Sequence, residues 1–418
     1  MNWLIKFKLG IMACLVLASP LFAKPLVIIE LTDSCLAGEC DQIRGVTHAL
    51  VQKFHEEEKI FPQIITLDLQ GGADQNEVSF SSLVEIPRDN PEAIFISSGA
   101  YGIRAFRMLR ERDKTQGIFV YVSHQIIGND DPSSIQLKSL VNIADFIALP
   151  HHVFEVNDPW VEALKKAIEG SKTHLLEVTG VVHNMHAEDI LKAVAEHGKT
   201  MPVAKKYMLV ILGGDVQNND GKTWTYYTPQ EAEKLAEYVN AQMTSEPDLF
   251  VLITNAPRTG RFDPATGRDV NFHEKGGPLD PVTAAFMKGF SDQTRVQLYN
   301  FEKGEPSFFK ALLGLIQKKV GVVFVPGEST SMISQTIDNM SPGSVTLYTH
   351  GAMKEIHEAH VADEFMAGRV SLLEATSDGR YAFIGVQSHS KAPTLSASET
   401  VANAIWAMIQ EQSEKKSD

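Results

Sequence analysis

The sequence predicts an α/β protein with two Rossmann-like domains. Short runs of β-branched and other apolar residues alternate with amphipathic segments of helical period, and this alternation stops once and then restarts. Polar loops that contain glycine follow several of the apolar runs. Such alternation is typical of mostly parallel sheets with helices on both faces. With 418 residues, 44% of them apolar, the chain is long enough for two domains with ordinary cores.

The first domain is predicted over residues 24–200. Short apolar runs predict its strands at residues 26–31, 64–67, 93–97, 118–123, 146–149 and 175–178. Amphipathic segments predict its helices at residues 42–58, 100–112 and 187–196. The pattern loosens at residues 197–203, where Gly198 and Pro202 are typical of a connection, so the domain boundary is predicted there.

The second domain is predicted over residues 201–390. Its strands are predicted at residues 206–212, 249–254, 296–299, 322–325 and 345–348. Its helices are predicted at residues 229–242, 307–317 and 329–339. A last helix is predicted at residues 396–411, within a C-terminal segment of residues 391–418, because Ser396 and Glu399 have the spacing of a capping box.

The N-terminus has the pattern of an export signal over residues 1–23. Lys6 and Lys8 precede an apolar run that ends at a small residue, Ala23, which suits a cleavage site. The run is short for a membrane span. However, Leu21 stands where cleavage sites prefer a small residue, so an uncleaved membrane anchor is the alternative. The sequence therefore predicts an exported, periplasmic protein, or one that this segment anchors to the membrane.

Charge and cysteine content narrow the possible partners. Lys and Arg number 38 against 52 acidic residues, a net charge of −14, which argues against nucleic acid because its binding requires neutralisation of phosphates. Cys35 and Cys40 remain after the export signal is removed, and an isolated pair in an exported chain predicts a short-loop disulfide. Neither these thiols nor the paired histidines have the further ligands of a metal site, so no metal and no cofactor are predicted.

Residues 321–337 are the most informative segment. A β-branched run ends at Pro326-Gly327, and a helix with Ser329 and Ser331 at its start follows. Free backbone amides and the positive end of the helix dipole meet at such a position, which predicts an anion site. Glu328 would repel phosphate but accepts well from sugar hydroxyls. The alternative is that Ser329 or Ser331 only caps the helix.

Three other loops follow predicted strands in the same way. Asp33, Gly38 and Gln42 lie in the loop and helix start after the first strand. Gly213 and Gly214 end the first strand of the second domain, and Arg258 and Thr259 follow a later strand. Carboxyl ends of parallel strands meet at one edge of a sheet, so these residues are candidates for one ligand site. Each loop alone could equally be a structural turn, and Arg258 could be an ordinary surface residue.

In chain order, these loops resemble the mitochondrial fission protein family of the elongated-mitochondria type. The matching positions are Leu31-Thr-Asp33, Gly38, Gln42, Asp145 with Pro150-His-His152, Gly213-Gly214, Arg258-Thr259, Glu305-Pro-Ser-Phe-Phe309 and Glu328-Ser-Thr-Ser-Met332. Glu39 stands where the family has His, Pro257 where it has a second Arg, and Glu328 where it has Asp. The similarity extends from about residue 26 to about residue 373.

The resemblance implies a fold like that of the GT-B glycosyltransferases, with a nucleotide-sugar cleft between two lobes and a C-terminal helix that crosses back to the first lobe. It implies that Asp33 or Gln42 faces the acceptor as a catalytic residue. The ligand-binding residues would be Gly38, Gly213, Gly214, Arg258, Thr259, Glu328, Ser329 and Ser331. The partner would be a nucleotide sugar or another small molecule. The alternative is an exported two-lobe ligand-binding protein, or a pseudoenzyme, without transfer activity.

Overall fold

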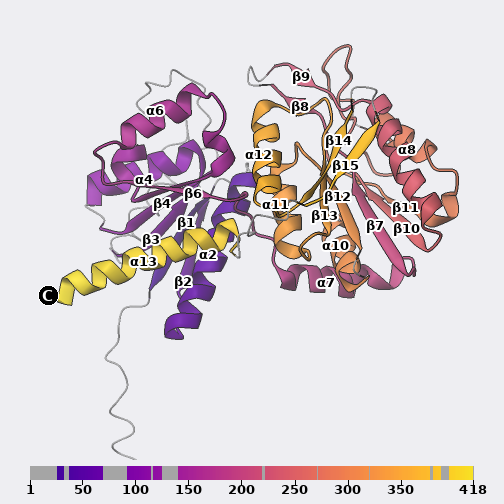
Figure 1. The fold of residues 1–418 in the computed structure, drawn as a ribbon. Coiled ribbons are helices and arrows are strands. Elements are labelled where there is room, and N and C mark those ends of the chain that lie inside the picture. The colour runs from indigo at the N-terminus through magenta and orange to yellow at the C-terminus, as the bar shows by residue number, and fades with distance from the viewer. Residues whose placement is uncertain are drawn as a thin grey trace, which may run out of the picture.

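The protein folds into two α/β lobes that lie side by side (Figure 1). The computed structural model describes residues 26–32, 37–68, 92–113, 116–124, 140–218, 222–270, 272–319, 321–376, 380–386 and 395–417. Each lobe is built on a mainly parallel sheet with helices on both faces, and the last helix returns to the first lobe. The predicted GT-B-like pair of Rossmann-like lobes is therefore confirmed.

The N-terminal lobe contains a six-stranded, fully parallel sheet in the order β2-β1-β3-β4-β5-β6. Its strands are β1 (Val27–Thr32), β2 (Gln63–Asp68), β3 (Ile94–Ser97), β4 (Ile118–Val122), β5 (Phe146–Pro150) and β6 (His174–Val178). Helices α4 (Gly99–Asp113) and α6 (Pro159–Ile168) pack on one face, and α2 (Ala37–Glu58) and α13 (Ala397–Ser417) cover the other. Both sheet faces are buried, which explains the continuous apolar runs.

The C-terminal lobe contains a seven-stranded sheet in the order β11-β10-β7-β12-β13-β14-β15, antiparallel only at β15. Its strands are β7 (Lys206–Ile211), β10 (Leu249–Thr254), β11 (Val296–Tyr299), β12 (Val322–Pro326), β13 (Val345–Tyr348), β14 (Ser371–Ala375) and β15 (Tyr381–Ile384). One face packs against α8 (Pro229–Ser245) and α9 (Pro281–Lys288). The other packs against α7 (Ala187–His197), α10 (Phe309–Lys319), α11 (Thr330–Asn339) and α12 (Glu355–Met366). A small hairpin, β8 (Val216–Gln217) and β9 (Trp224–Thr225), follows β7.

The boundary between the lobes lies earlier than the sequence predicts. Residues 197–203 were expected to separate the domains, which would leave α7 in the first one. In the structure α7 packs against α10, and Ile190 of α7 is buried in the core of the C-terminal lobe. The chain therefore crosses between the lobes at residues 179–186, directly after β6. The Gly and Pro residues near position 200 belong instead to the connection between α7 and β7.

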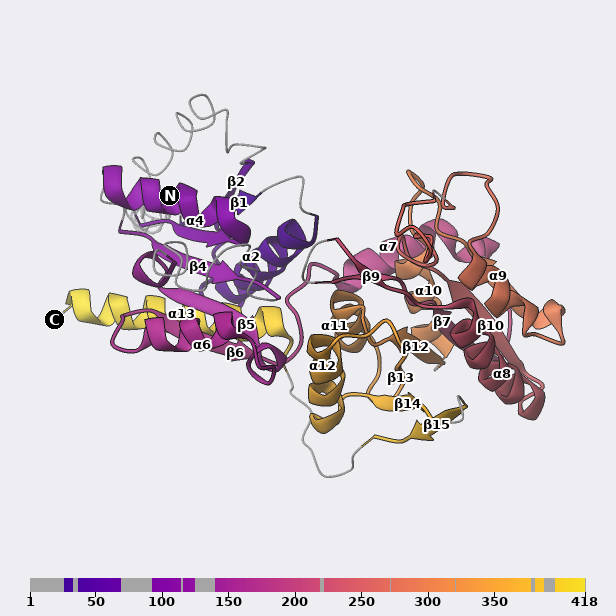
Figure 2. The same cartoon turned by 90° about the horizontal axis from the view of Figure 1, so that it is seen from above.

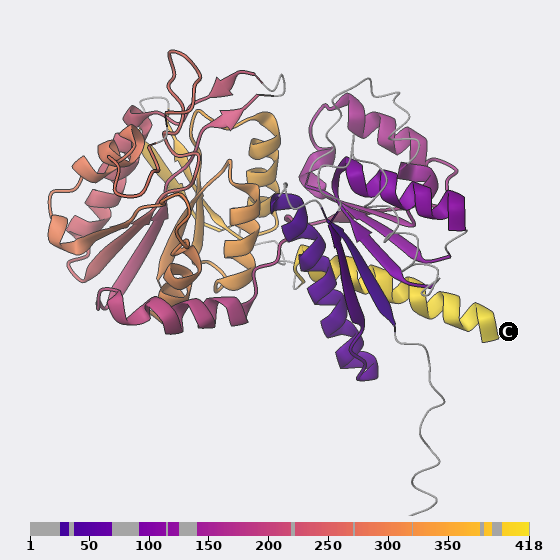
Figure 3. The ribbon, with the colours of Figure 1, turned by 180° about the vertical axis from the view of Figure 1, so that it is seen from behind.

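The C-terminal helix α13 lies along α2 of the first lobe (Figure 3). Val401 and Ile405 of α13 are fully buried in the same apolar cluster as Leu50 of α2. The Trp406 ring meets Phe54 edge to face, with centroids 5.0 Å apart. The last helix therefore completes the core of the first lobe.

Replacing Ile405 by alanine is expected to lower the free energy of unfolding by about 2–4 kcal/mol, because the fully buried side chain leaves a cavity that its neighbours fill only partly. Ile405→Val removes one methylene and is expected to cost about 1 kcal/mol. Guanidinium unfolding followed by circular dichroism measures both values. Equal stability of the wild type and the alanine variant would show that α13 does not belong to the folded core.

Candidate functional site

The predicted ligand residues of the second half meet at the carboxyl edge of the C-terminal sheet. The register of the sheet brings them together, since β12 pairs with β13 at Pro326 and Tyr348 and with β7 at Phe324 and Val210. Continued past the strand ends, this register aligns Gly214, Glu328 and His350 in one row. Gly214 N–H donates to Glu328 Oε1 at 2.7 Å, and Glu328 Oε2 lies 2.5 Å from His350 Nε2.

Glu328 is bound inside the protein. Its side chain is 1% exposed, and its second neighbour, His350, is fully buried. His350 Nδ1 accepts from Ala352 N–H at 3.2 Å, so the ring hydrogen lies on Nε2 and points at the carboxylate. Burial alone would raise the pKa of Glu328, but His350 and the Gly214 amide outweigh it and hold the pKa below its ordinary value. In this structure both carboxylate oxygens of Glu328 accept from groups of the protein itself, and the expected role of Glu328 as an acceptor for sugar hydroxyls stays a prediction.

Gly213, Gly214 and Thr259 also serve the packing of the loops. A Cβ on Gly213 would lie 2.9 Å from His350 Nε2, and one on Gly214 would lie 2.8 Å from Arg258 Cβ. Thr259 is fully buried, and its hydroxyl donates to Leu212 O at 3.3 Å. The glycines let protein loops approach one another, and the Thr259 hydroxyl bonds to a neighbouring loop. In this structure the three residues position the loops, and their expected contacts with a ligand stay predictions.

The start of α11 has no side-chain cap. Ser329 stands at the N-cap, but its hydroxyl donates to Glu328 Oε1 at 3.3 Å and accepts no hydrogen bond from an amide of the helix. The half-buried Ser331 lies in the first turn. The first amides of a helix have no partner within the helix, so they need a cap, water or a ligand. The alternative that Ser329 only caps the helix does not describe this structure, and the predicted anion site at this position is retained.

Two cationic side chains, Arg258 and Lys354, lie in the neighbourhood of this helix start. Arg258 is exposed, and its charge lowers the pKa of Glu328. Lys354 and His357 lie at the start of α12, the next helix along the sheet edge. Burial lowers the pKa of His357 to about 4 although Glu328 opposes it, with Lys354 and Arg258 adding to the shift. Two helix N-termini and two cations thus occupy one corner, which favours an anionic ligand.

Asp215 joins the loops around this corner. Its carboxylate accepts from Tyr227 N–H at 3.0 Å and from Phe262 N–H at 3.2 Å, and its own N–H donates to Arg258 O at 3.0 Å. Burial raises the pKa of Asp215 to about 6, with the nearby Asp280 adding to the effect of burial. Asp215 therefore holds the Arg258 loop and the β8–β9 hairpin in place.

On the first lobe, the structure describes only some of the predicted site residues. Gln42 is buried in α2, its Nε2 lies 2.8 Å from His124 Nδ1, and its Oε1 has no hydrogen-bond partner among the residues that the structure describes. Gly38 is exposed in the first turn of α2. Asp33 and Cys35 lie outside the described residues, as do residues 1–25, so the disulfide to the buried Cys40 and the export signal stay predictions.

The first turns of α2 nevertheless reach the second lobe. Asp41 Oδ2 accepts from Gln335 Nε2 of α11 at 3.3 Å. Viewed from above, α11 and α12 are the elements of the C-terminal lobe that face the first lobe (Figure 2). The candidate site on the second lobe therefore adjoins the boundary between the lobes, as the GT-B arrangement predicts.

A separate cavity of about 200 Å³ lies at the opposite end of α11. Its lining includes Asp338, Arg369, Leu395 and Ser396, and so combines the end of α11 with the start of α13. It does not include Arg258, Ser329 or Ser331. This cavity is therefore distinct from the candidate anion site.

Within the ranges that the structure describes, no three His, Cys, Asp or Glu side chains are grouped so that they could hold a metal ion. Nor does any helix there combine the length and apolar character needed to cross a bilayer.

Comparisons with known proteins find similarity only at the level of structure. No family model and no curated protein match the chain. A solved protein from Listeria monocytogenes, provisionally assigned as a UDP-N-acetylglucosamine 2-epimerase, is similar at 14% identity over 94% of this chain and 98% of that one, with a TM-score of 0.44. A UGT transferase from Siraitia grosvenorii in complex with UDP is similar at 10% identity, 94% and 93% coverage and a TM-score of 0.41. MnaA of S. aureus in a structure with UDP is similar at 13% identity over 92% of this chain and 88% of that one, with a TM-score of 0.40. The function of the present chain therefore rests on its own residues.

Proposed function

We propose that the chain binds a nucleoside diphosphate or a nucleotide sugar between its lobes, as a GT-B-like glycosyltransferase or a degenerate relative of one. The observation that carries the proposal is the uncapped start of α11, which lies beside Arg258 at the carboxyl edge of the second sheet. The loop motifs that resemble the fission protein family support it and suggest a distant relationship to that family.

The chemistry of this corner suits a diphosphate. The amides of Thr330 and Ser331 at the helix start would donate to phosphate oxygens, and the helix dipole favours negative charge there. The guanidinium of Arg258 would form charge-assisted hydrogen bonds to the same group. In glycosyl transfer, an acceptor hydroxyl attacks the sugar carbon, the bond from that carbon to the diphosphate breaks, and the diphosphate leaves with the electron pair. Donors at this position would stabilise the charge that develops on it.

A second function, ligand binding without transfer, is favoured by one observation on the first lobe. Gln42, the predicted catalytic residue that the structure describes, carries an amide, which neither gives nor takes a proton near neutral pH. It is also 2% exposed. An exported two-lobe receptor, or a pseudoenzyme, would need the cleft but no acid or base. The predicted export through residues 1–23 agrees with this role, and sequencing the N-terminus of the chain recovered from a periplasmic fraction tests that location.

Replacing Thr330 by proline is expected to weaken the binding of UDP by about tenfold or more, because it removes one amide donor at the first helical position. Proline suits this position of a helix, so α11 itself is expected to persist. Thr330→Ala keeps the amide and is expected to bind UDP like the wild type. Isothermal titration with UDP, ADP and GDP measures the affinities.

Arg258→Ala is expected to weaken binding by a similar factor, through loss of charge-assisted contacts. Turnover of a bound UDP-sugar by the wild type would favour the transferase, and binding without turnover would favour the receptor or pseudoenzyme. If the wild type binds none of the three diphosphates at millimolar concentration, the proposal is wrong.

A further inference from the structure

The two lobes meet at a buried pair of histidines. His152 follows β5 of the first lobe in the short 3-10 helix His151–Phe154, and His360 lies on α12 of the second. Their rings are 4.3 Å apart between centroids, and the two residues are 1% and 0% exposed. Among the described residues, none of their four ring nitrogens has a hydrogen-bond partner. Buried polar atoms without partners are costly and rare, so this contact requires an explanation.

A second histidine pair joins the first lobe to the start of α7. His48 of α2 stacks on His186, with centroids 3.6 Å apart and ring planes 17° from parallel. Gln52 Nε2 lies 2.8 Å from His48 Nε2, and a donor at that distance requires an unprotonated ring nitrogen. His186 Nε2 lies 2.9 Å from Asn184 Oδ1. In each pair, one imidazole belongs to the first lobe. The other belongs to the second lobe (His360) or to the segment that leads into it (His186).

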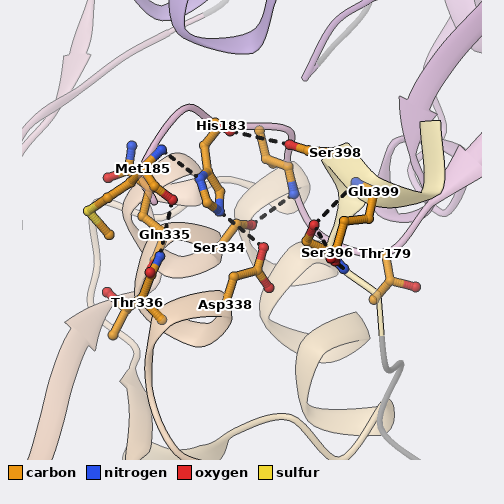
Figure 4. Close-up of polar contacts among 12 residues, drawn as sticks. Thr179, His183, Met185, Ser334, Gln335, Thr336, Asp338, Ser396, Ser398 and Glu399 are labelled. Carbon is orange, nitrogen blue, oxygen red and sulfur yellow. Dashed lines mark hydrogen bonds and ion pairs between the residues drawn. The ribbon is translucent and has the colours of Figure 1, made fainter. Parts of the chain in front are cut away.

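The connecting segment between the lobes is fixed to α11, as Figure 4 shows. His183 Nε2 lies 3.0 Å from Asp338 Oδ2, and Val181 N–H donates to Ser334 Oγ at 2.8 Å. Gly180 has φ +78, which glycine alone adopts without strain. These contacts hold the connecting segment itself in place. His186 is the last residue of that segment, whereas the His152–His360 pair is a separate contact outside it.

Most of the titratable groups that face His152 are other imidazoles. Around it stand His151 in its own turn, His124 at the end of β4, and His357 and His360 on α12. The carboxylates on this side face His360 instead: Glu364 lies 3.3 Å from its Nε2 and also 3.2 Å from Arg369 Nε, and the charge of Asp363 acts on His360 as well. Around His186 stand His48 and His183, with Asp189 and Glu188 of α7 opposing them. A proton on His152 would therefore have no counter-charge in contact.

We propose that the contact between the lobes is an acid-sensitive latch, which holds them together near neutral pH and releases them when His152, packed against His360, and His186, stacked on His48, take up protons. A neutral imidazole can pack against another ring without water, whereas an imidazolium in the same place loses its hydration. Release would allow the lobes to separate about the hinge at residues 179–186 while each lobe stays folded.

The direction of the pH effect follows from the pKa values. With the lobes together, burial lowers the pKa of His152 well below its ordinary value and that of His186 to about 4. In separated lobes both return toward about 6.5. Acid therefore favours separation of the lobes from about pH 6.5 downward. For each histidine, the equilibrium constant for separation rises by at most about tenfold per pH unit, and by less for the half-buried His186.

One contact between the lobes acts in the opposite sense. His151 Nδ1 lies 3.1 Å from Asp363 of α12, and although burial lowers the pKa of His151, that bond and the charges of Asp363, Glu155 and Glu177 raise it overall. Acid therefore strengthens this ion pair. Its histidine side chain is 47% exposed, and exposed pairs contribute little. The buried His152, which has no carboxylate in contact, decides the outcome.

The test is small-angle scattering of the purified full-length chain between about pH 8 and about pH 5 at fixed ionic strength, with far-UV circular dichroism on the same samples. We expect a reversible rise in radius of gyration, with a midpoint between about pH 6.5 and about pH 5, while the helix signal stays constant. His152→Phe keeps a ring of similar size and loses no hydrogen bond, so it is expected to fold and to shift the midpoint down by about one pH unit. His48→Phe should shift it in the same direction, at a more exposed position.

The matched control is His55→Phe, the same substitution on an exposed turn of α2, which should leave the midpoint unchanged. A constant radius of gyration in the wild type would overturn the proposal. The proposal would also be overturned if the double variant His48→Phe/His152→Phe expanded at the same pH midpoint as the wild type. If the helix signal falls together with compactness, acid unfolds the lobes and does not separate them, and the latch is again wrong.

Discussion

Replacing Arg369 by alanine is expected to lower the free energy of unfolding of the C-terminal lobe by about 3–5 kcal/mol. The side chain of Arg369 is 5% exposed and bridges two carboxylates, with Nη2 2.5 Å from Asp338 Oδ1 and Nε 3.2 Å from Glu364 Oε2. Without the guanidinium, His360 is the one basic side chain among the described residues that is paired with the fully buried Glu364. Removal of one partner of a buried ion pair leaves an uncompensated charge, which costs more than the pair ever contributes.

The matched control for Arg369 is Arg107→Ala on α4. Arg107 pairs with Glu111 at 2.9 Å, but both side chains are exposed, so the loss is expected to stay within about 0.5 kcal/mol. Guanidinium unfolding of both variants gives the comparison. Glu364→Gln in the Arg369→Ala background should recover part of the stability, since it removes the orphaned charge. Equal losses for Arg369→Ala and Arg107→Ala would contradict the buried-bridge account.

Replacing Glu328 by alanine is expected to cost about 3–5 kcal/mol, because it leaves two buried donors, Gly214 N–H and His350 Nε2–H, without an acceptor. Glu328→Gln keeps an acceptor for Gly214 but cannot also accept from His350 through its NH₂ group, and is expected to cost about 1–2 kcal/mol. Thermal and guanidinium unfolding measure both. If Glu328→Ala is as stable as the wild type but loses ligand binding, Glu328 contacts the ligand and the internal role is wrong.

The same carboxylate gives an acid dependence with a defined sign. The pKa of Glu328 in the folded protein lies below its ordinary value. Its contribution is therefore complete above the ordinary carboxyl pKa of about 4.3 and is lost as the pH falls below that value toward the lower folded pKa. Unfolding curves at successive pH values should show a smaller acid-induced loss in Glu328→Gln than in the wild type.

Most of the sheet could be predicted because its strands are buried on both faces. Such strands are continuous apolar runs, which need no knowledge of tertiary contacts. The helices α6 and α9 were missed although Asp158-Pro159 and Asp280-Pro281 are typical helix starts, because both helices are short. The missed helix α12 begins after Lys354, which is not a typical N-cap residue, so its sequence carries little local signal.

For the candidate site, the sequence predicted which loops come together but not what each side chain contacts. Loops at the carboxyl edge of a parallel sheet meet, and this rule brought Gly214, Arg258 and Ser329 together correctly. It does not tell whether a polar side chain faces a ligand or a neighbouring loop. The internal role of Glu328 depends on His350, which becomes its neighbour only through the register of β12 on β13. That register is a long-range property of the sheet, and a single sequence does not determine it.

The return of α13 to the first lobe has a consequence for biosynthesis. The ribosome makes this helix after the strands of both sheets, yet Val401 and Ile405 complete an apolar core with residues encoded hundreds of positions earlier. During translation, the face of the first sheet that α13 covers remains open to chaperones and to aggregation until α13 has been made. The second lobe, whose strands and helices are all encoded before α13, can assemble earlier. We therefore expect the lobe that is encoded second to reach its native packing first.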